Sequence, residues 1–234
     1  MFKRDESRDK LFPGKVRICD LKNNRYISRK PIYDFLVKNS GLVGSLLDFG
    51  CGSMQYKSIF QNVSKYIGLD IEGAEKNGFV ADGVVYYDGK IIPFEDEQFD
   101  SVIAVEVLEH VEDLELSLKE INRILKPDGK FIFTVPMTFP LHLEPWDYRR
   151  FTKYGIENEL KKSGFSNIYI QNSTCVDDTL RRMKIVELGW SAGRVHRFFY
   201  KRYIMYANIR FIFNRKKTKD SKMPIDYLIV CDKN

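Results

Sequence analysis

An apolar run near residue 50 ends in an acid and two glycines. Asp48 lies two residues before Gly50, and Cys51 separates Gly50 from Gly52. Glycine lets backbone N–H groups come close to a ligand, and ligands of open α/β sheets bind at the carboxyl ends of the strands. A carboxylate at this position would accept hydrogen bonds from an ammonium group but would repel a diphosphate. A nicotinamide-type loop would also place a third glycine where this chain has Gln55.

Two further acids end the next apolar runs. Asp70 follows Gly50 by twenty residues, a distance at which a carboxylate can bind the two hydroxyls of a ribose. Asp88 ends the run after that and could accept a hydrogen bond from an adenine amine. Ammonium, ribose and adenine together describe S-adenosylmethionine. Each acid alone could simply cap a turn, but three acids in this order favour the cofactor.

The chain contains three histidines, and two of them are candidates for acid–base chemistry. An acceptor hydroxyl must lose its proton when it takes up a methyl group, and an imidazole titrates near neutral pH. His142 is expected beside the strand ends, so it is the first candidate for the general base. His110 is the second candidate. A structural hydrogen bond that pins the loop is the alternative role for His142.

The elements that must position these residues are predicted from apolar runs between turn residues. Seven such runs predict strands, at 46–49, 66–69, 84–87, 101–105, 130–135, 168–171 and 227–231. Helices are expected around 31–38, after the glycine loop, and from 114 to 125, where Asp113 is the N-cap and Pro127-Asp128-Gly129 is the stop. Alternating strands and helices favour a parallel sheet covered by helices. We expect one domain over 1–234, with an N-terminal extension (1–44) and an insertion (181–219).

Composition limits the function further. The 234 residues are 44% hydrophobic, and the four cysteines form neither a C-x-x-C pair nor a zinc spacing. We see no secretory signal or membrane-spanning run, so a cytoplasmic location is expected. The insertion 181–219 contains twelve Lys or Arg and one acid, Glu187, a net charge of 12 − 1 = +11. Its mixture of cations and aromatic residues suits a helix on an anionic membrane surface. A lid or oligomer contact is the alternative, and nucleic acid is the least favoured partner because no RNA-binding module accompanies it.

Several segments in register resemble the class I S-adenosylmethionine-dependent methyltransferases. They are Leu47–Gly52, Gly68–Asp70, Ile92–Asp100, Val107–Val111, Leu125–Lys130 and Val135–Pro136, within a similarity that covers about 45–170. Met54 departs from the pattern, because many members have a third glycine there. The resemblance implies a Rossmann-like, seven-stranded, mostly parallel sheet with an antiparallel last strand, helices on both faces and S-adenosylmethionine across the strand ends. It also implies cofactor-binding residues: Asp48, Gly50, Cys51 and Gly52 for the methionine moiety, Asp70 and Ile71 for the ribose, Asp88 for the adenine, and Val105 with Glu106 for the floor.

A second resemblance concerns the acceptor. The segment His142–Thr152 is similar to an H-x-x-P-x-D-Y-x-R-F-T segment of methyltransferases associated with bacterial surface-glycan synthesis. It implies O-methylation of a sugar or glycan, which could be lipid-linked. Trp146 and Tyr148 would stack on a sugar ring, and Asp147 and Arg150 would bind a polar or phosphorylated group.

Two alternatives stay open. Glu106, Glu109 and His110 would lie at i, i+3 and i+4 on one helix face, and the pattern resembles the E-x-x-E-H of metal-dependent RNA and quinone-precursor O-methyltransferases. His142 could complete such a site, but the same V-L-E-H occurs in relatives without a known metal, so no metal ligand is predicted. The chain could also be a catalytically silent cofactor-binding or scaffold protein. The complete set of three acids argues against silence.

Overall fold

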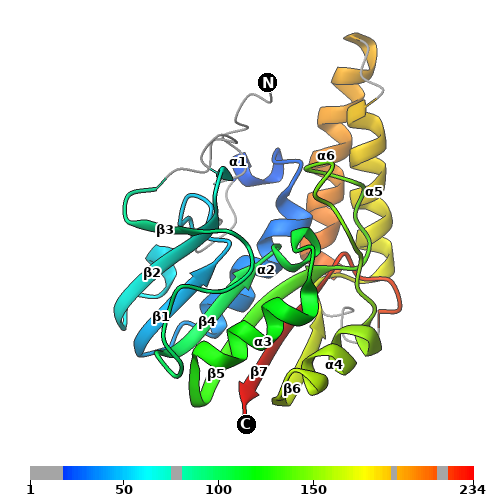
Figure 1. The fold of residues 1–234 in the computed structure, drawn as a ribbon. Helices are drawn as coiled ribbons and strands as arrows, with labels where there is room; N and C mark the ends of the chain where they lie inside the picture. Colours follow the sequence, from blue (N-terminus) through cyan, green and yellow to red (C-terminus); the bar gives the residue numbers. More distant parts are fainter. Residues whose placement is uncertain (1–17, 75–80, 191–193, 215–220) are drawn as a thin grey trace.

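The computed structural model describes residues 18–74, 81–190, 194–214 and 221–234 (Figure 1). Parts of two predicted segments lie outside these residues, namely 1–17 of the N-terminal extension and 191–193 and 215–219 of the basic insertion.

A seven-stranded sheet forms the centre of the fold, in the order β3-β2-β1-β4-β5-β7-β6. β7 runs antiparallel to both β5 and β6, while the other neighbouring strands are parallel. The predicted sheet, including its antiparallel last strand, is therefore confirmed. The strands are β1 (Gly44–Phe49), β2 (Val63–Ile71), β3 (Val84–Tyr87), β4 (Phe99–Val105), β5 (Leu125–Pro136), β6 (Phe165–Asn172) and β7 (Asp226–Lys233).

Helices cover both faces of the sheet (Figure 1). Successive strand residues point to opposite faces, so Leu47 packs in the core with Leu118 and Leu160, whereas Leu46 packs in the core with Phe35. The first core lies under α3 (Leu114–Ile124) and α4 (Lys153–Lys162), and the second lies under α2 (Tyr26–Lys38). The remaining helices are α1 (Ile18–Leu21), the 3-10 helices η1 (Lys57–Ile59) and η3 (Leu108–His110), α5 (Val176–Trp190) and α6 (Arg194–Asn214).

The basic insertion folds as two long helices between the last two strands. Figure 1 shows α5 and α6 side by side, projecting beyond the sheet. α5 begins at Val176, five residues before the predicted start of the insertion. Among the described residues, no helix combines the length and the apolar character that crossing a membrane requires.

Three local predictions need correction or refinement. The Asp113 side chain accepts from the Leu116 N–H, as expected of an N-cap, but α3 ends at Ile124 and β5 starts directly after it, before Pro127. Turns and the short η1, in place of an α-helix, follow the glycine loop. Glu106 has a φ of +57° outside any helix, so the predicted helix face with Glu109 and His110 does not exist.

Candidate active site

The glycine loop leaves the carboxyl end of β1 in a conformation that L side chains rarely adopt. Gly50 has a φ of +68° and Gly52 a φ of +52°. A Cβ on Gly50 would lie 2.4 Å from Val107 Cγ1, so a neighbouring side chain already fills the space that this glycine leaves. Gly68 in β2 leaves room for the Cys51 side chain of the loop, because a Cβ on Gly68 would lie 2.7 Å from Cys51 Sγ. Close packing of the loop on the sheet is thus one reason for these glycines.

The predicted ribose and adenine acids end the two strands beyond β1. Asp70 accepts hydrogen bonds from the N–H groups of Gly52 and Ile71, each at 2.8 Å, and so ties the glycine loop to β2. Asp88 is exposed after β3 and accepts from the Lys90 N–H at 2.9 Å. Because β3, β2 and β1 are neighbours, the acids and the loop line one edge of the sheet. Their contacts with ribose and adenine stay predictions.

Asp48 belongs to the interior of the sheet. Its carboxylate is buried and accepts a hydrogen bond from the Tyr66 hydroxyl at 2.6 Å. Burial raises the pKa of Asp48 to about 7, although the bond from Tyr66 acts in the opposite direction. Cys51 is buried as well, and burial raises the pKa of its thiol, so the thiol is protonated at neutral pH. The proposed contact of Asp48 with an ammonium group stays a prediction.

A buried ionic network lies behind the end of β4. Val105 is the last residue of that strand, and the next residue, Glu106, accepts from the Thr134 hydroxyl at 2.7 Å. Burial raises the pKa of Glu106 and of Asp226 in β7. Burial acts to lower the pKa of Arg29, but its pKa is raised overall because Tyr56 and the carboxylates of Glu106 and Asp226 face its guanidinium. Charges from α2, β4 and β7 therefore meet behind the predicted floor.

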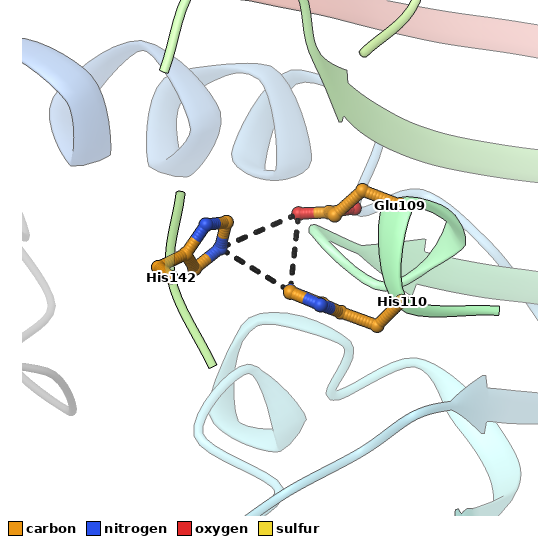
Figure 2. Close-up of side chains that lie close together, drawn as sticks. All are labelled: Glu109, His110 and His142. Atoms are coloured by element: carbon orange, nitrogen blue, oxygen red, sulfur yellow. Dashed lines mark hydrogen bonds and ion pairs between the residues drawn. The ribbon is translucent and has the colours of Figure 1, made fainter. Parts of the chain in front are cut away.

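The two candidate bases meet each other and a buried carboxylate. His110 and Glu109 lie on η3, and His142 lies on the loop after β5 (Figure 2). The two Nε2 atoms are 3.2 Å apart, and Glu109 Oε1 is 3.6 Å from His110 Nε2 and 3.9 Å from His142 Nε2. These three side chains form the triad cluster, and one ligand atom from each lies within 4.8 Å of the others.

Backbone contacts fix which ring nitrogens point into the triad cluster. His110 Nδ1 lies 2.6 Å from the Trp146 carbonyl, and His142 Nδ1 lies 3.3 Å from the Pro140 carbonyl. A carbonyl only accepts, and His142 Nδ1 also lies 3.2 Å from Asp147 Oδ2, so these contacts favour a proton on each Nδ1 and a lone pair on Nε2. Burial lowers the pKa of both histidines, that of His142 to about 4.

Glu109 adds a third acceptor. Its side chain is fully buried, and neither carboxylate oxygen has a hydrogen-bond partner among the described residues. Burial, followed by the nearby charge of Glu106, raises the pKa of Glu109 well above its usual range. Two imidazole nitrogens thus face a carboxyl group whose raised pKa favours its protonated form, an arrangement that suits a shared proton or, once that proton is lost, a cation.

Asp147 and Arg150 hold the loop that carries His142. The Arg150 guanidinium binds both Asp147 oxygens, at 2.6 and 2.7 Å, and also donates to the carbonyls of Phe139 and Pro140. Asp147 accepts from the His142 N–H at 2.9 Å. Burial acts to raise the pKa of Asp147, but these bonds lower it to about 2. Their charges are thus paired inside the loop, and a direct contact of Asp147 or Arg150 with the acceptor stays a prediction.

Trp146 and Tyr148 present their rings to solvent, with 53% and 44% of each residue exposed. Their backbones are fixed, because the Trp146 carbonyl faces His110 and the Tyr148 N–H donates to the Glu109 carbonyl at 3.0 Å. Stacking of these rings on a sugar stays a prediction.

Sequence reasoning missed four residues around the site. Arg29, Tyr66, Thr134 and Asp226 come from α2, β2, β5 and β7. Tyr66 and Thr134 fall inside runs that predict strands, and Arg29 occurs in a segment of mixed charge. Asp226 directly precedes the predicted last strand, and this position beside a strand end is the one signal that could have identified it.

Comparisons with known proteins agree with this architecture. Residues 47–133 match the family described as a methyltransferase domain. An uncharacterized protein of Methanocaldococcus jannaschii is 32% identical over 163 residues, which are 67% of this chain and 58% of that protein. The mitochondrial ubiquinone biosynthesis O-methyltransferase of Dictyostelium discoideum is 29% identical over 156 residues, which are 56% of this chain and 46% of that enzyme. The chain thus spans about half the length of these two curated relatives.

Solved structures show the same fold at low sequence identity. An S-adenosylmethionine-dependent methyltransferase from Thermotoga maritima has a TM-score of 0.55 and 15% identity, covering 87% of this chain and 89% of that chain. The phosphoethanolamine N-methyltransferase 2 of Haemonchus contortus, solved with S-adenosylhomocysteine, has a TM-score of 0.50 and 17% identity, covering 95% of this chain and 61% of that chain.

The fold is that of solved S-adenosylmethionine-dependent methyltransferases, and residues 47–133 match the family described as a methyltransferase domain. This match implies S-adenosylmethionine as the cofactor. The residues present fit this cofactor, because a glycine loop and the carboxylates of Asp70 and Asp88 follow three neighbouring strands.

Proposed function

We propose that this chain is an O-methyltransferase that modifies a hydroxyl of a sugar or glycan. The observation that carries the proposal is the triad cluster, in which His110 and His142 turn inward-facing nitrogens toward the buried Glu109. These groups follow β4, which lies beside β1 and its glycine loop, and β5, the next strand in the sheet. A proton acceptor is thus expected where a methyl group would be transferred.

The residues of the cluster have separate tasks. S-adenosylmethionine supplies an electrophilic methyl group when it is bound. His142 is neutral above about pH 4 because burial lowers its pKa, so its Nε2 can accept a hydrogen bond from the acceptor hydroxyl. Glu109 has a raised pKa and lies 3.9 Å from His142 Nε2, which makes its ionised form the stronger base. Asp147 and Arg150 position His142 through the loop.

A sugar is the favoured acceptor for two reasons. The exposed rings of Trp146 and Tyr148 lie on the loop that carries His142, and aromatic faces of this kind stack on sugar rings. The segment His142–Thr152 also resembles the corresponding segment of glycan-associated methyltransferases. A lipid-linked sugar would satisfy both features.

Methyl transfer from labelled S-adenosylmethionine tests the proposal. The acceptors are nucleotide-linked sugars, polyprenyl-diphosphate-linked sugars, a catechol precursor of quinones, and RNA. We expect label in a sugar fraction, and we expect His142→Ala to lower turnover at least 100-fold while the Kd for S-adenosylmethionine changes less than twofold. Label in the catechol or RNA alone would contradict the sugar. Binding of S-adenosylmethionine without methyl transfer to any of these acceptors would favour the scaffold alternative.

A metal-assisted O-methyltransferase of a quinone precursor or RNA is the second candidate. It is favoured by the triad cluster itself, since two imidazole nitrogens and one carboxylate are a ligand set for a divalent ion. Glu109, His110 and His142 would hold the ion, which would lower the pKa of an acceptor hydroxyl. Glu106, the first residue of the E-x-x-E-H pattern, lies outside this ligand set and accepts a hydrogen bond from the Thr134 hydroxyl.

Calorimetry with Mn²⁺, Mg²⁺ and Zn²⁺ on the chelated protein separates the candidates without an activity assay. Binding of one ion per chain, lost in Glu109→Gln and retained in the matched Glu157→Gln on α4, would support a metal site. Heat identical in wild type and Glu109→Gln would contradict it. The general-base proposal requires instead that turnover survive exhaustive chelation.

A further inference from the structure

The outer face of α6 is apolar and basic along its length. Its inner face packs Ile204, Ala207 and Phe211 against Tyr26 of α2 and Ile185 of α5. This packing fixes the rotation of the helix, so the residues on the other side are held at the surface. α6 is therefore a rigid support for its exposed side chains.

Five large apolar side chains on α6 are exposed, namely Phe199, Met205, Tyr206, Ile209 and Phe213. Phe199 is 63% exposed and Phe213 is 79% exposed. At roughly 100° per residue, all five and the exposed Arg202 and Arg210 fall within an arc of about 140°. We call these seven residues the α6 stripe.

The charge on α6 has one sign. Its sequence contains five Lys or Arg and no Asp or Glu. Lys201 is exposed outside the stripe, about 40° beyond Met205 at 100° per residue. A stripe of this kind is complementary to a surface that is apolar within and negatively charged at its boundary.

We propose that the α6 stripe docks on an anionic lipid bilayer, with the helix lying along the surface. Phe199, Tyr206 and Phe213 would enter the boundary between headgroups and acyl chains, where aromatic side chains are favoured. Arg202 and Arg210 would contact lipid phosphates. Met205 and Ile209 distinguish this partner from a nucleic acid, because aliphatic side chains bury in lipid but do not stack on bases.

Packing connects the stripe to the candidate active site. On α5, the Arg182 guanidinium lies 5.4 Å from the Phe139 ring centre, and the Phe139 ring lies 5.1 Å from the His142 ring. Phe139 also packs against the core that holds the inner face of α6. Docking through the stripe would thus bring the triad cluster to the bilayer, where a lipid-linked acceptor resides. The docking proposal does not depend on the identity of that acceptor.

Flotation of the full chain with vesicles tests the docking. The vesicles contain phosphatidylcholine alone or with phosphatidylglycerol, each at 50 mM and 500 mM salt. We expect flotation with the anionic vesicles at low salt and release at high salt. Arg202→Gln with Arg210→Gln should weaken partitioning about 30-fold, since each basic residue contributes roughly 1 kcal/mol. Ile209→Ser with Phe213→Ser should abolish flotation.

Matched controls come from α4, which lies beside β6 below α5 and α6 in Figure 1. Tyr154→Ser removes an aromatic residue that is 77% exposed, and Lys161→Gln with Lys162→Gln removes two exposed charges. Both should float like wild type. Flotation that the stripe variants leave unchanged would overturn the proposal. Salt-sensitive binding to single-stranded RNA without flotation would also overturn it. A wild-type dimer that does not float, and that the stripe variants convert to monomers, would overturn it as well.

Discussion

The cofactor half and the acceptor half of this molecule are built in different ways. The cofactor half is made of the ends of β1, β2 and β3, and its parts contact one another through the backbone, as when Asp70 accepts from the Gly52 N–H. The predicted acceptor half is made of side chains from η3 and the loop after β5. Local backbone geometry therefore forms the predicted cofactor site, whereas tertiary contacts form the predicted acceptor site. Four predictions test this contrast, from the largest expected effect to the smallest.

Asp48→Asn tests whether the cofactor half contains a carboxylate that opposes folding when it is charged. The folded pKa is about 7 and the ordinary value is 3.8, so between these values the folded state binds a proton that the unfolded state has released. The free energy of unfolding should fall as pH rises from 4 to 7, on the order of 4 kcal/mol at about 1.4 kcal/mol per pKa unit. The amide still accepts from Tyr66, so urea unfolding of the variant should lack this loss. Parallel pH profiles for the two proteins would contradict the assignment.

Gly50→Ala tests the packing of the glycine loop. The added Cβ would lie 2.4 Å from Val107 Cγ1 at a φ of +68°, so we expect a loss of about 3 kcal/mol in the free energy of unfolding. Val107→Ala in the same chain removes the overlap but not the φ strain, and it should restore roughly half of the loss. Gly73→Ala is the matched control, because its φ is +89° and no atom lies within 4 Å of the added Cβ. Equal losses at both positions would reject the contact with Val107.

Asp147→Asn tests whether the acceptor half depends on a positioned loop. The amide keeps one acceptor for the His142 N–H but loses the paired charge of Arg150. We expect turnover to fall roughly 10- to 100-fold, about 1.4 to 2.7 kcal/mol, with the Kd for S-adenosylmethionine unchanged. Asp177→Asn, at an exposed acid of α5, should retain turnover. A higher KM for the acceptor with full turnover would instead support direct binding of the acceptor by Asp147.

Trp146→Ala tests the smallest effect, which is stacking on the acceptor. Removing an exposed ring should raise the KM for a sugar acceptor several-fold, about 1 kcal/mol, without a change in the free energy of unfolding. Trp146→Phe should keep most of the affinity because it keeps an aromatic face. Initial rates over a range of acceptor concentrations measure both variants. An unchanged KM in Trp146→Ala would exclude the ring from the acceptor site.

The same contrast explains what the sequence predicted. Asp48, Gly50 and Asp70 could be placed because each follows an apolar run, and a strand end needs only local information. Glu109 and His110 were correctly adjacent, but the helix assumed for Glu106 was wrong, since its φ of +57° turns the chain before η3 begins. The contact of His142 with His110 joins residues 32 positions apart, and the sequence indicated it only through the alternative in which His142 completes a metal site. Arg29 lies near the site only because α2 packs on the second face of the sheet, and the sequence alone does not show this packing.

The order of the last strands has a consequence for how this enzyme can change. β6 and β7 are antiparallel neighbours, and Ser173 donates to the Asp226 carbonyl at 3.0 Å where the α5–α6 segment leaves and returns. The two ends of the segment are therefore already joined, so the sheet sets no requirement on its length or content. We expect α5 and α6 to tolerate changes in length and in their outer faces, provided that their inner faces keep the packing against α2 and Phe139.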